Sequence, residues 1–427
     1  MAIKVALINT ADSGGGAAEA CMRLLKALRE QQVDATLIVQ HKKRDNPAVY
    51  STERSAWDKA RSNINFLAER LPFIALYERD RTVRFAFSTA NTGTDISREK
   101  VIQDADILHI HWTNSGFLST NDLKKLIRLN KPVVWTLHDM WLFTGGCHYA
   151  GTCDHFKREC GNCYFLRNPQ PNDLSYTGWQ RKNRMLINAE NISVVTCSNW
   201  LGEVAKESSL LQNASIQAIP NPIDTDVFSP REKNAARKKW NIDAGKKIIL
   251  FGAANIADRR KGLIYLVEAL QTLKNIYTGT QDVEIVIFGK NKRFDVTSLA
   301  FKVHQLSIIT SADDLAEIYS LADVFLLPSI EDNLPNTIME AMSCGTPACA
   351  FNTGGIPDMI DHQINGYLAE FKSAADLAAG VHQVLFSGDH HLMAQAARTK
   401  VLQEFNNSKV AGQYIGLYNS LLERQMA

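Results

Sequence analysis

The sequence predicts an α/β protein with two domains, each built around a parallel β-sheet. The chain has 427 residues, which is more than one ordinary hydrophobic core accommodates. Short runs rich in Val, Ile and Leu occur without polar alternation, as is typical of strands covered on both faces. These runs alternate with longer helical patterns, which indicates repeated β-α-β units and hence parallel strands.

The runs fall into two groups separated by a proline-containing segment. The expected strands are residues 4–8, 35–39, 107–111, 133–137 and 193–197 in the first half, and residues 247–251, 284–288, 324–327 and 346–351 in the second. Pro220 and Pro222 interrupt regular structure between the groups and suit a linker. We therefore expect a first domain over residues 1–219, a second over residues 220–405 and a final helix over residues 406–427.

The overall composition is that of a globular protein without a membrane span. Hydrophobic residues make up 45% and charged residues 22%, and the net charge of +2 gives no indication of nucleic-acid binding. No run approaches the roughly 18 apolar residues of a spanning helix. The apolar residues 3–8 run into Gly14 without a small-residue cleavage site, so we interpret them as a strand rather than a signal peptide. These features favour a cytoplasmic protein, in which the eight cysteines are reduced or hold a metal.

Residues 54–86 differ in character, because aromatic and apolar side chains are mixed with arginines. One interpretation is an acceptor-side surface that touches anionic lipid. The other, more frequent for basic amphipathic segments, is a pair of helices packed on the first domain. The side chains concerned are Trp57, Phe66, Leu71, Phe73, Ile74, Tyr77 and Phe85, together with Arg61, Arg70, Arg79, Arg81 and Arg84.

A glycine loop follows the first expected strand and precedes a helical pattern. Gly14, Gly15 and Gly16 allow close backbone approach, and a helix start offers free N–H groups to an anion. The spacing of the dinucleotide-binding fingerprint is absent. A tight strand–helix turn and an active-site loop explain these residues equally well.

Polar residues also stand at the ends of two later strands. His138 and Asp139 follow the strand at 133–137, and His111 ends the strand at 107–111. Ligands of open α/β sheets bind at the carboxyl ends of the strands, so His138 is a candidate substrate contact.

Four cysteines occur close together in the first half of the chain. The last two form a Cys-x2-Cys pair, the usual half of a tetrahedral zinc site, whereas the first two are more widely spaced than usual. Unligated thiols and a reversible disulfide are the alternatives. A bound zinc would be structural, because four protein ligands leave no open position for a substrate. The residues are Cys147, Cys153, Cys160 and Cys163, with His148 and His155 nearby.

The strongest motif covers residues 327–347. A polar loop follows the strand at 324–327, and a helix is expected to begin near Pro335, a residue suited to a first helical turn. The N–H groups of a helix start suit a diphosphate, and a carboxylate suits the hydroxyls of a ribose. Asp332 and Glu340 bracket this helix start, so the motif contains what a nucleotide requires.

A run of cations follows the strand at 247–251. Arg259, Arg260 and Lys261 stand directly before Gly262 and a helical pattern. Such cations bind phosphate and stabilise a leaving diphosphate. A solvated charge run would explain these residues alone, but the motif at 327–347 favours phosphate binding.

Together these motifs resemble those of the retaining glycosyltransferases of family 4, which have the GT-B fold. The resemblance covers nearly the whole chain. Residues 135–141 and the cysteines that follow them are similar to a subgroup found in exopolysaccharide and lipopolysaccharide biosynthesis. The matching residues are Pro328-Ser329, Glu340-Ala341-Met342, Gly345-Thr346-Pro347, Lys261-Gly262, Pro220-Asn221, Ile223-Asp224, Phe228 and Gly354-Gly355-Ile356-Pro357.

The resemblance implies an architecture and a role for several residues. The GT-B fold consists of two Rossmann-like parallel-sheet domains that face a cleft, with a C-terminal helix that returns to the first domain. Glu340 would hold the ribose hydroxyls, Lys261 would bind the diphosphate, and His138 would lie near the reacting sugar. The glycine loop at 14–16 would lie on the acceptor side.

This chain departs from the family pattern at two places. Asp332 stands where the first acid of the family's E-x7-E motif is a glutamate. Asn255 and Ile256 stand where a partner arginine of the lysine is expected, so Arg259 or Arg260 would supply that charge.

The expected activity is transfer of a sugar from a nucleotide diphosphate sugar to a glycan or lipid-linked acceptor, with retention and without a catalytic metal. The subgroup implies cell-surface polysaccharide biosynthesis, in the cytoplasm or at the inner face of the membrane. A catalytically impaired GT-B scaffold of a polysaccharide assembly complex is the alternative. The expected catalytic residues are His138, Arg260, Lys261 and Asp332; the donor-binding residues are Gly252, Arg259, Asn333, Leu334, Pro335, Asn336, Thr337 and Glu340; the acceptor-side residues are Gly14, Gly15, Gly16, His111 and Asp139.

Overall fold

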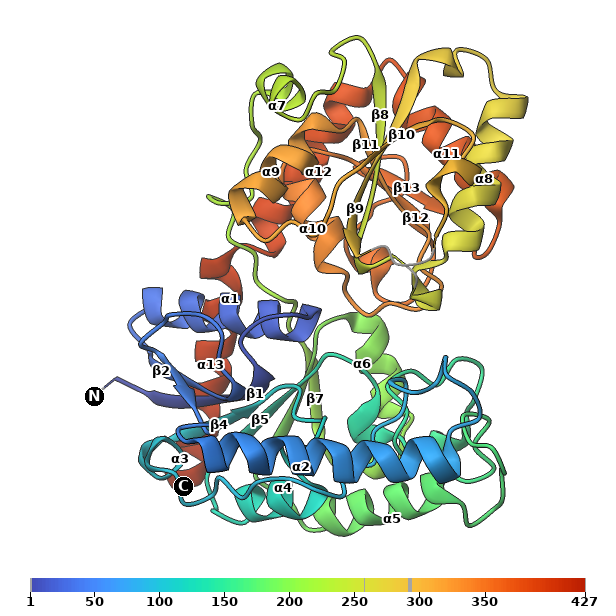
Figure 1. Ribbon diagram of the computed structural model, residues 1–427. Coiled ribbons are helices and arrows are strands. Elements are labelled where there is room, and N and C mark those ends of the chain that lie inside the picture. The colour runs from blue at the N-terminus through green and yellow to red at the C-terminus, as the bar shows by residue number, and fades with distance from the viewer. Residues whose placement is uncertain (1, 257, 291–293, 427) are drawn as a thin grey trace. The chain divides into compact units, whose positions relative to one another are not determined.

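The computed structural model describes residues 2–256, 258–290 and 294–426. These residues form two compact units, one that runs up to Pro220 and resumes at Val410, and one that comprises Asn221–Lys409 (Figure 1). Each unit contains a parallel β-sheet flanked by helices. The predicted α/β class with two parallel sheets is confirmed.

The sheet of the first unit has seven strands in the order β3-β2-β1-β4-β5-β6-β7, and every neighbouring pair is parallel. The strands are β1 (Lys4–Ala11), β2 (Asp34–His41), β3 (Val49–Ser51), β4 (Ile107–Ile110), β5 (Val133–Leu137), β6 (Ile192–Thr196) and β7 (Ser215–Ala218). The helices are α1 (Gly16–Glu30), α2 (Ala56–Pro72), α3 (Lys100–Asp104), α4 (Thr120–Ile127), α5 (Leu174–Leu186), α6 (Asn199–Lys206) and α13 (Asn407–Met426).

The two faces of this sheet bury different side chains, because neighbours along a strand point in opposite directions. Ile8 and Trp135 belong to the core on one face. Leu7 and Val134 belong to the core on the other face, where α1 and α13 pack. This covering of both faces explains why the strands appear in the sequence as continuous apolar runs.

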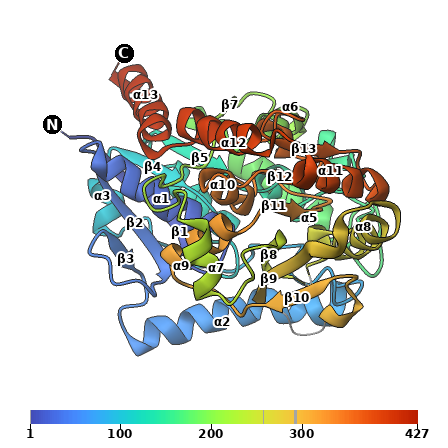
Figure 2. The ribbon, with the colours of Figure 1, turned by 90° about the horizontal axis from the view of Figure 1, so that it is seen from above.

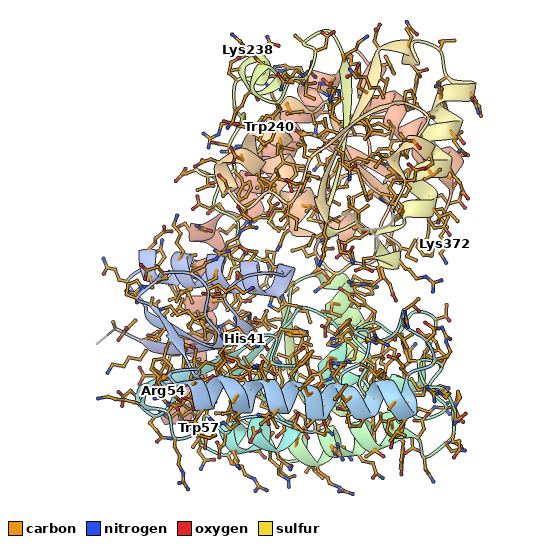
Figure 3. The ribbon with its side chains drawn as sticks, viewed as in Figure 1. His41, Arg54, Trp57, Lys238, Trp240 and Lys372 are labelled. Carbon is orange, nitrogen blue, oxygen red and sulfur yellow. The ribbon has the colours of Figure 1, made fainter. Side chains whose placement is uncertain are left out.

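Residues 54–86 contain one long helix, α2, and a short helical turn at Phe73–Tyr77, rather than two comparable helices. Ser55 and Asp58 form a capping box that fixes the start of α2. Trp57, in the first turn, is 85% exposed. Figure 3 labels it beside Arg54 at this end of the helix.

The sheet of the second unit has six strands in the order β10-β9-β8-β11-β12-β13, again all parallel. Helices α8 and α11 lie side by side along it (Figure 2). The strands are β8 (Lys247–Asn255), β9 (Val283–Lys290), β10 (Lys302–Gln305), β11 (Val324–Leu327), β12 (Ala348–Phe351) and β13 (Gly366–Ala369). The helices are α7 (Lys233–Lys239), α8 (Leu263–Ile276), α9 (Ala312–Leu321), α10 (Asn336–Ser343), α11 (Ala374–Phe386) and α12 (His390–Glu404).

Four strands were not expected from the sequence: β3, β7, β10 and β13. Each has only three or four residues. β7 and β10 bury little of their surface, so they lack the apolar run that marks a covered strand. Pairing with a neighbouring strand, rather than local sequence, makes these segments strands.

Candidate active site

The second unit places a lysine and a carboxylate from distant segments in direct contact. Lys261 ends the helical turn that follows β8, and Asp332 lies in the loop that follows β11. Lys261 Nζ lies 2.6 Å from Asp332 Oδ2, and the Ser329 hydroxyl donates to the same oxygen at 3.3 Å. The two segments singled out in the sequence as phosphate-binding and nucleotide-binding are therefore joined at the carboxyl ends of adjacent strands.

Backbone contacts hold these two loops together. Gly262 has a φ of 67°, and a Cβ built on it would lie 1.8 Å from the Pro328 carbonyl oxygen. Only glycine allows this approach, which explains the glycine directly after Lys261. The Ile330 N–H also donates to the Arg260 carbonyl at 2.7 Å.

The start of α10 offers hydrogen-bond donors to an anion. Pro335 is its N-cap and supplies no side-chain cap. Among the described residues, the Thr337 hydroxyl is a buried polar group without a hydrogen-bond partner, and it lies in the first turn of the helix. A helix start combines a partial positive charge with N–H groups that have no intrahelical acceptor. This region therefore suits a phosphate oxygen.

Glu340 is held by a residue that the sequence analysis missed. Tyr319, a fully buried residue of α9, donates its hydroxyl to Glu340 Oε2 at 2.7 Å. The bond orients the carboxylate, which is itself 7% exposed. The sequence did not indicate a functional role for Tyr319, because an aromatic residue on the apolar side of a helix is ordinarily part of the core.

The remaining residues expected to bind the donor differ in their burial and in their contacts within the second unit. Arg260 bonds Asp258 at 2.7 Å, and Arg259 is exposed. Asn333 and Leu334 are buried immediately before α10. Gly252 lies within β8 against the ring of Phe288. Asn336 begins α10, and its side chain accepts from Asn221 at 3.4 Å.

The first unit contains a small pocket at the carboxyl ends of β4 and β5. His111 Nδ1 and His138 Nε2 lie 3.0 Å apart there. Among the described residues, His111 Nε2 and Asn114 Oδ1 are buried without a hydrogen-bond partner. The pocket can therefore hydrogen-bond a small polar group. It is lined by His111, Trp112, Thr113, Asn114, Trp135, Thr136, Leu137, His138, Asp139, Trp141 and Leu142.

Burial keeps the histidines of this pocket neutral. It lowers the pKa of His138 to about 4, against the opposing charge of Asp139. Burial also lowers the pKa of His111 well below its ordinary value, and the neighbouring His109 and His138 contribute. Neutral imidazoles both donate and accept hydrogen bonds, as a bound hydroxyl requires.

Asp139 is held by its own neighbours within this pocket. Its carboxylate accepts from the Trp112 indole at 3.1 Å and from the Trp141 N–H at 2.8 Å, and it pairs with His148 at 2.7 Å. These bonds tie together the loops after β4 and β5.

His109 stacks on His111 at 4.3 Å between ring centroids but does not line the pocket, and it joins the sheet to the C-terminal helix. Its Nδ1 lies 2.7 Å from the Tyr418 hydroxyl, and its Nε2 lies 2.7 Å from Thr136 Oγ1. Tyr414 bonds the same threonine at 2.9 Å. His109 is therefore a satisfied core histidine that helps to attach α13.

The glycine loop and the cysteines occupy other places in the first unit. Gly15 is the N-cap of α1 without a side-chain cap, and neither Gly14 nor Gly15 would place a Cβ against another atom. The loop is thus an open helix start. Cys147, Cys153, Cys160 and Cys163 line a second cavity, separate from the histidine pocket.

The sequence matches known protein families over most of its length. The model of Glycosyltransferase Family 4 matches residues 14–227, and the model described as Glycosyl transferases group 1 matches residues 232–400. The chain belongs to glycosyltransferase family 4. This family 4 member is therefore a glycosyltransferase, and the two parallel-sheet domains are those of the GT-B fold.

The chain is similar to several glycosyltransferases that have different names. N-acetyl-alpha-D-glucosaminyl L-malate synthase of Bacillus anthracis is 25% identical over 325 residues, which are 75% of this chain and 76% of that protein. UDP-Gal:alpha-D-GlcNAc-diphosphoundecaprenol alpha-1,3-galactosyltransferase of Escherichia coli is 22% identical over 223 residues, 51% and 57% of the two chains. The structure of WaaG, a glycosyltransferase involved in lipopolysaccharide biosynthesis, matches with a TM-score of 0.60 at 15% identity, covering 95% of this chain and 98% of that one.

In the part of the chain that the structure describes, no helix has both the length and the apolar character needed to cross a membrane.

Proposed function

We propose that this glycosyltransferase transfers a sugar, with retention, from a nucleotide diphosphate sugar to a glycan or lipid-linked acceptor in cell-surface polysaccharide biosynthesis. The observation that carries the proposal is the grouping of Lys261, the start of α10 and Glu340 in one unit. The Escherichia coli relative, whose name includes a UDP-sugar and a diphosphoundecaprenol acceptor, supports the same classes of donor and acceptor.

The second unit would bind the donor. Lys261 and the start of α10, with the Thr337 hydroxyl, suit the two phosphates. The Glu340 carboxylate, oriented by Tyr319, suits the ribose hydroxyls. When the bond between the anomeric carbon and the diphosphate breaks, Lys261 and the helix start stabilise the negative charge of the leaving group.

The first unit would bind the acceptor. His138, His111 and Asn114 present polar atoms to one small pocket, and a sugar hydroxyl has the donor and acceptor that these atoms require. The acceptor oxygen would form the new bond to the anomeric carbon, and its proton would pass to an oxygen of the departing diphosphate.

Nucleotide release from a panel of sugar nucleotides tests this function directly. The wild-type enzyme is expected to release nucleotide from one donor in the presence of lipid-linked or soluble glycan acceptors. Glu340→Ala is expected to lower kcat/KM by roughly 10²-fold, because a buried carboxylate that accepts donor hydroxyls is lost. Glu268→Ala, on the exposed side of α8, is the matched control and should leave the rate unchanged.

Absence of release from every donor would instead support a catalytically impaired scaffold of a polysaccharide assembly complex. Two features motivate that alternative: Asp332 replaces the glutamate of the family motif, and no arginine stands at Asn255 or Ile256. Isothermal titration with nucleoside diphosphates would then show whether the site still binds a donor.

A surface of α2 suits peripheral contact with an anionic membrane face. Trp57, Ile64, Leu67 and Leu71 are exposed and recur at helical spacing, so they form one apolar stripe. The same segment of the sequence, residues 54–86, also carries cationic side chains. Apolar insertion combined with attraction to anionic lipid is how interfacial helices bind membranes. These cations are Lys59, Arg61, Arg79, Arg81 and Arg84.

Vesicle co-sedimentation tests this contact. We expect the enzyme to bind vesicles that contain phosphatidylglycerol and not vesicles of phosphatidylcholine alone, with binding weakened by salt. Ile64→Glu should reduce binding several-fold by placing a charge in the apolar stripe. Ile264→Glu on α8 is a matched control, because both isoleucines are 63% exposed. Equal binding of the two variants would contradict the assignment of the surface to α2.

A further inference from the structure

The four cysteines of the segment between Phe143 and α5 line one cavity of the first unit, together with His155. Cys147, Cys160 and Cys163 are buried, and Cys153 is partly buried. Four thiols from one short segment that meet at one cavity form the ligand set of a closed zinc site.

The segment that carries these thiols has little regular structure to hold it. Between residues 144 and 173 its only assigned helix or strand is the helical turn His155–Lys157. The segment is nonetheless packed into the core, where Phe156 and Phe165 contribute to the same cluster as Trp135. Long segments without secondary structure are uncommon inside compact domains, so a cross-link would explain how this one is ordered.

A backbone donor already points at one of the sulfur atoms. The Gly145 N–H lies 3.1 Å from Cys160 Sγ. Gly145 is placed so tightly that a Cβ on it would lie 2.3 Å from the Ser175 carbonyl oxygen. This bond and the tight packing of Gly145 hold the Cys160 sulfur at the wall of the cavity.

A buried cation lies beside the cavity. Lys182, on α5, is 1% exposed, and its ammonium group donates to the Trp141 and Thr144 carbonyl oxygens. It also lies 3.8 Å from the centroid of the Trp141 ring. Cys147, Cys160 and, with a smaller effect, Asp139 are within its electrostatic reach. A buried ammonium is costly unless an anion compensates it, and a zinc ion with four thiolates carries a net negative charge.

The two histidines near the cysteines have other bonds. His148 bonds Asp139 through Nδ1 and Ser88 through Nε2, so both of its nitrogens are occupied. His155 Nδ1 donates to the Gly161 carbonyl at 2.7 Å and thereby holds the turn between Cys160 and Cys163. His155 thus positions the Cys-x2-Cys pair.

We propose that Cys147, Cys153, Cys160 and Cys163 together bind one structural zinc ion. Among the described residues, no three His, Cys, Asp or Glu side chains are grouped as metal ligands. Binding therefore requires the four thiols to come closer together than they lie in this structure. The site is independent of the donor and acceptor sites, since none of its ligands belongs to either.

Metal analysis of the purified full-length protein is the first test. We expect about one zinc ion per chain, released when a mercurial reagent titrates the thiols. Cys160→Ser and Cys163→Ser should each lose the zinc. Cys21→Ala, which changes a buried cysteine of α1 far along the chain, should keep it. His155→Ala should also keep it, and loss of zinc in that variant would overturn the four-cysteine ligand set.

Thiol counting and stability measurements cover the case in which the variants fail to fold. Denatured, unreduced wild-type protein treated with a chelator should show all eight cysteines as free thiols. Removing zinc from the wild-type protein should lower its melting temperature, and added zinc should restore it. Wild-type protein that lacks zinc, or that has four thiols missing because of disulfides, would overturn the proposal.

Discussion

Replacing Lys261 with methionine is expected to lower kcat/KM on the order of 10²–10³-fold, the cost of removing one group that stabilises developing negative charge. The Lys261 side chain, which is 20% exposed, contacts Asp332 at the carboxyl ends of β8 and β11. Because the leaving group carries the charge, the substitution should lower kcat as well as weaken donor binding. Steady-state kinetics with the donor identified from the panel would measure both.

Two further variants show whether the loss is due to the missing cation. Lys302→Met removes an exposed lysine that pairs with Glu284 on β9, and it should leave kcat/KM unchanged. The double variant Lys261→Met/Asp332→Asn removes both charges of the pair, so it leaves no uncompensated carboxylate. We expect its activity to stay low. Recovery of activity in the double variant, or a loss below tenfold in the single variant, would contradict the proposed role of Lys261.

Acid is expected to destabilise the first unit steeply. Burial lowers the pKa of His109 to about 3, that of His138 to about 4, and that of His111 well below its ordinary value. Unfolded histidines titrate near 6.5, so below that pH the unfolded chain binds more protons than the folded one. The free energy of unfolding should therefore decrease as the pH is lowered below 6.5, with a slope that approaches ~4 kcal/mol per pH unit for three protons.

Urea unfolding followed by tryptophan fluorescence at pH values from 6.5 to 5.5 would measure this slope, before most carboxylates titrate. Six of the seven tryptophans lie in the first unit, since only Trp240 belongs to Asn221–Lys409. His138→Asn should reduce the slope by about 1 kcal/mol per pH unit over this range, in which one unfolded histidine is only partly protonated. His391→Asn, exposed on α12, should not change it. A stability that is constant over this range would contradict the expected coupling.

The family motifs predicted which strand ends carry several residues of the proposed donor site, because each motif consists of residues close together in the sequence. Lys261 with Gly262, and Asp332 with the helix that begins after Pro335, could be placed at strand ends from local patterns alone. Tyr319 and Asn114 could not, because an ordinary helix position and a loop amide carry no signal of their own. Their importance depends on contacts with other elements.

The sequence by itself determined the α/β class, two parallel sheets and most strands, because burial on both faces of a strand leaves a continuous apolar run. The short strands β3, β7, β10 and β13 depended on pairing with neighbours, which local composition does not record. The same is true of side-chain roles. The sequence made His111, which ends its strand, the candidate and gave His109 no role, but it offered no partner for His109; the structure binds His109 to Tyr418 and Thr136 and leaves His111 at the pocket. Only the packing of α13 against the sheet decides between them, since that contact joins residues about 300 positions apart in the chain.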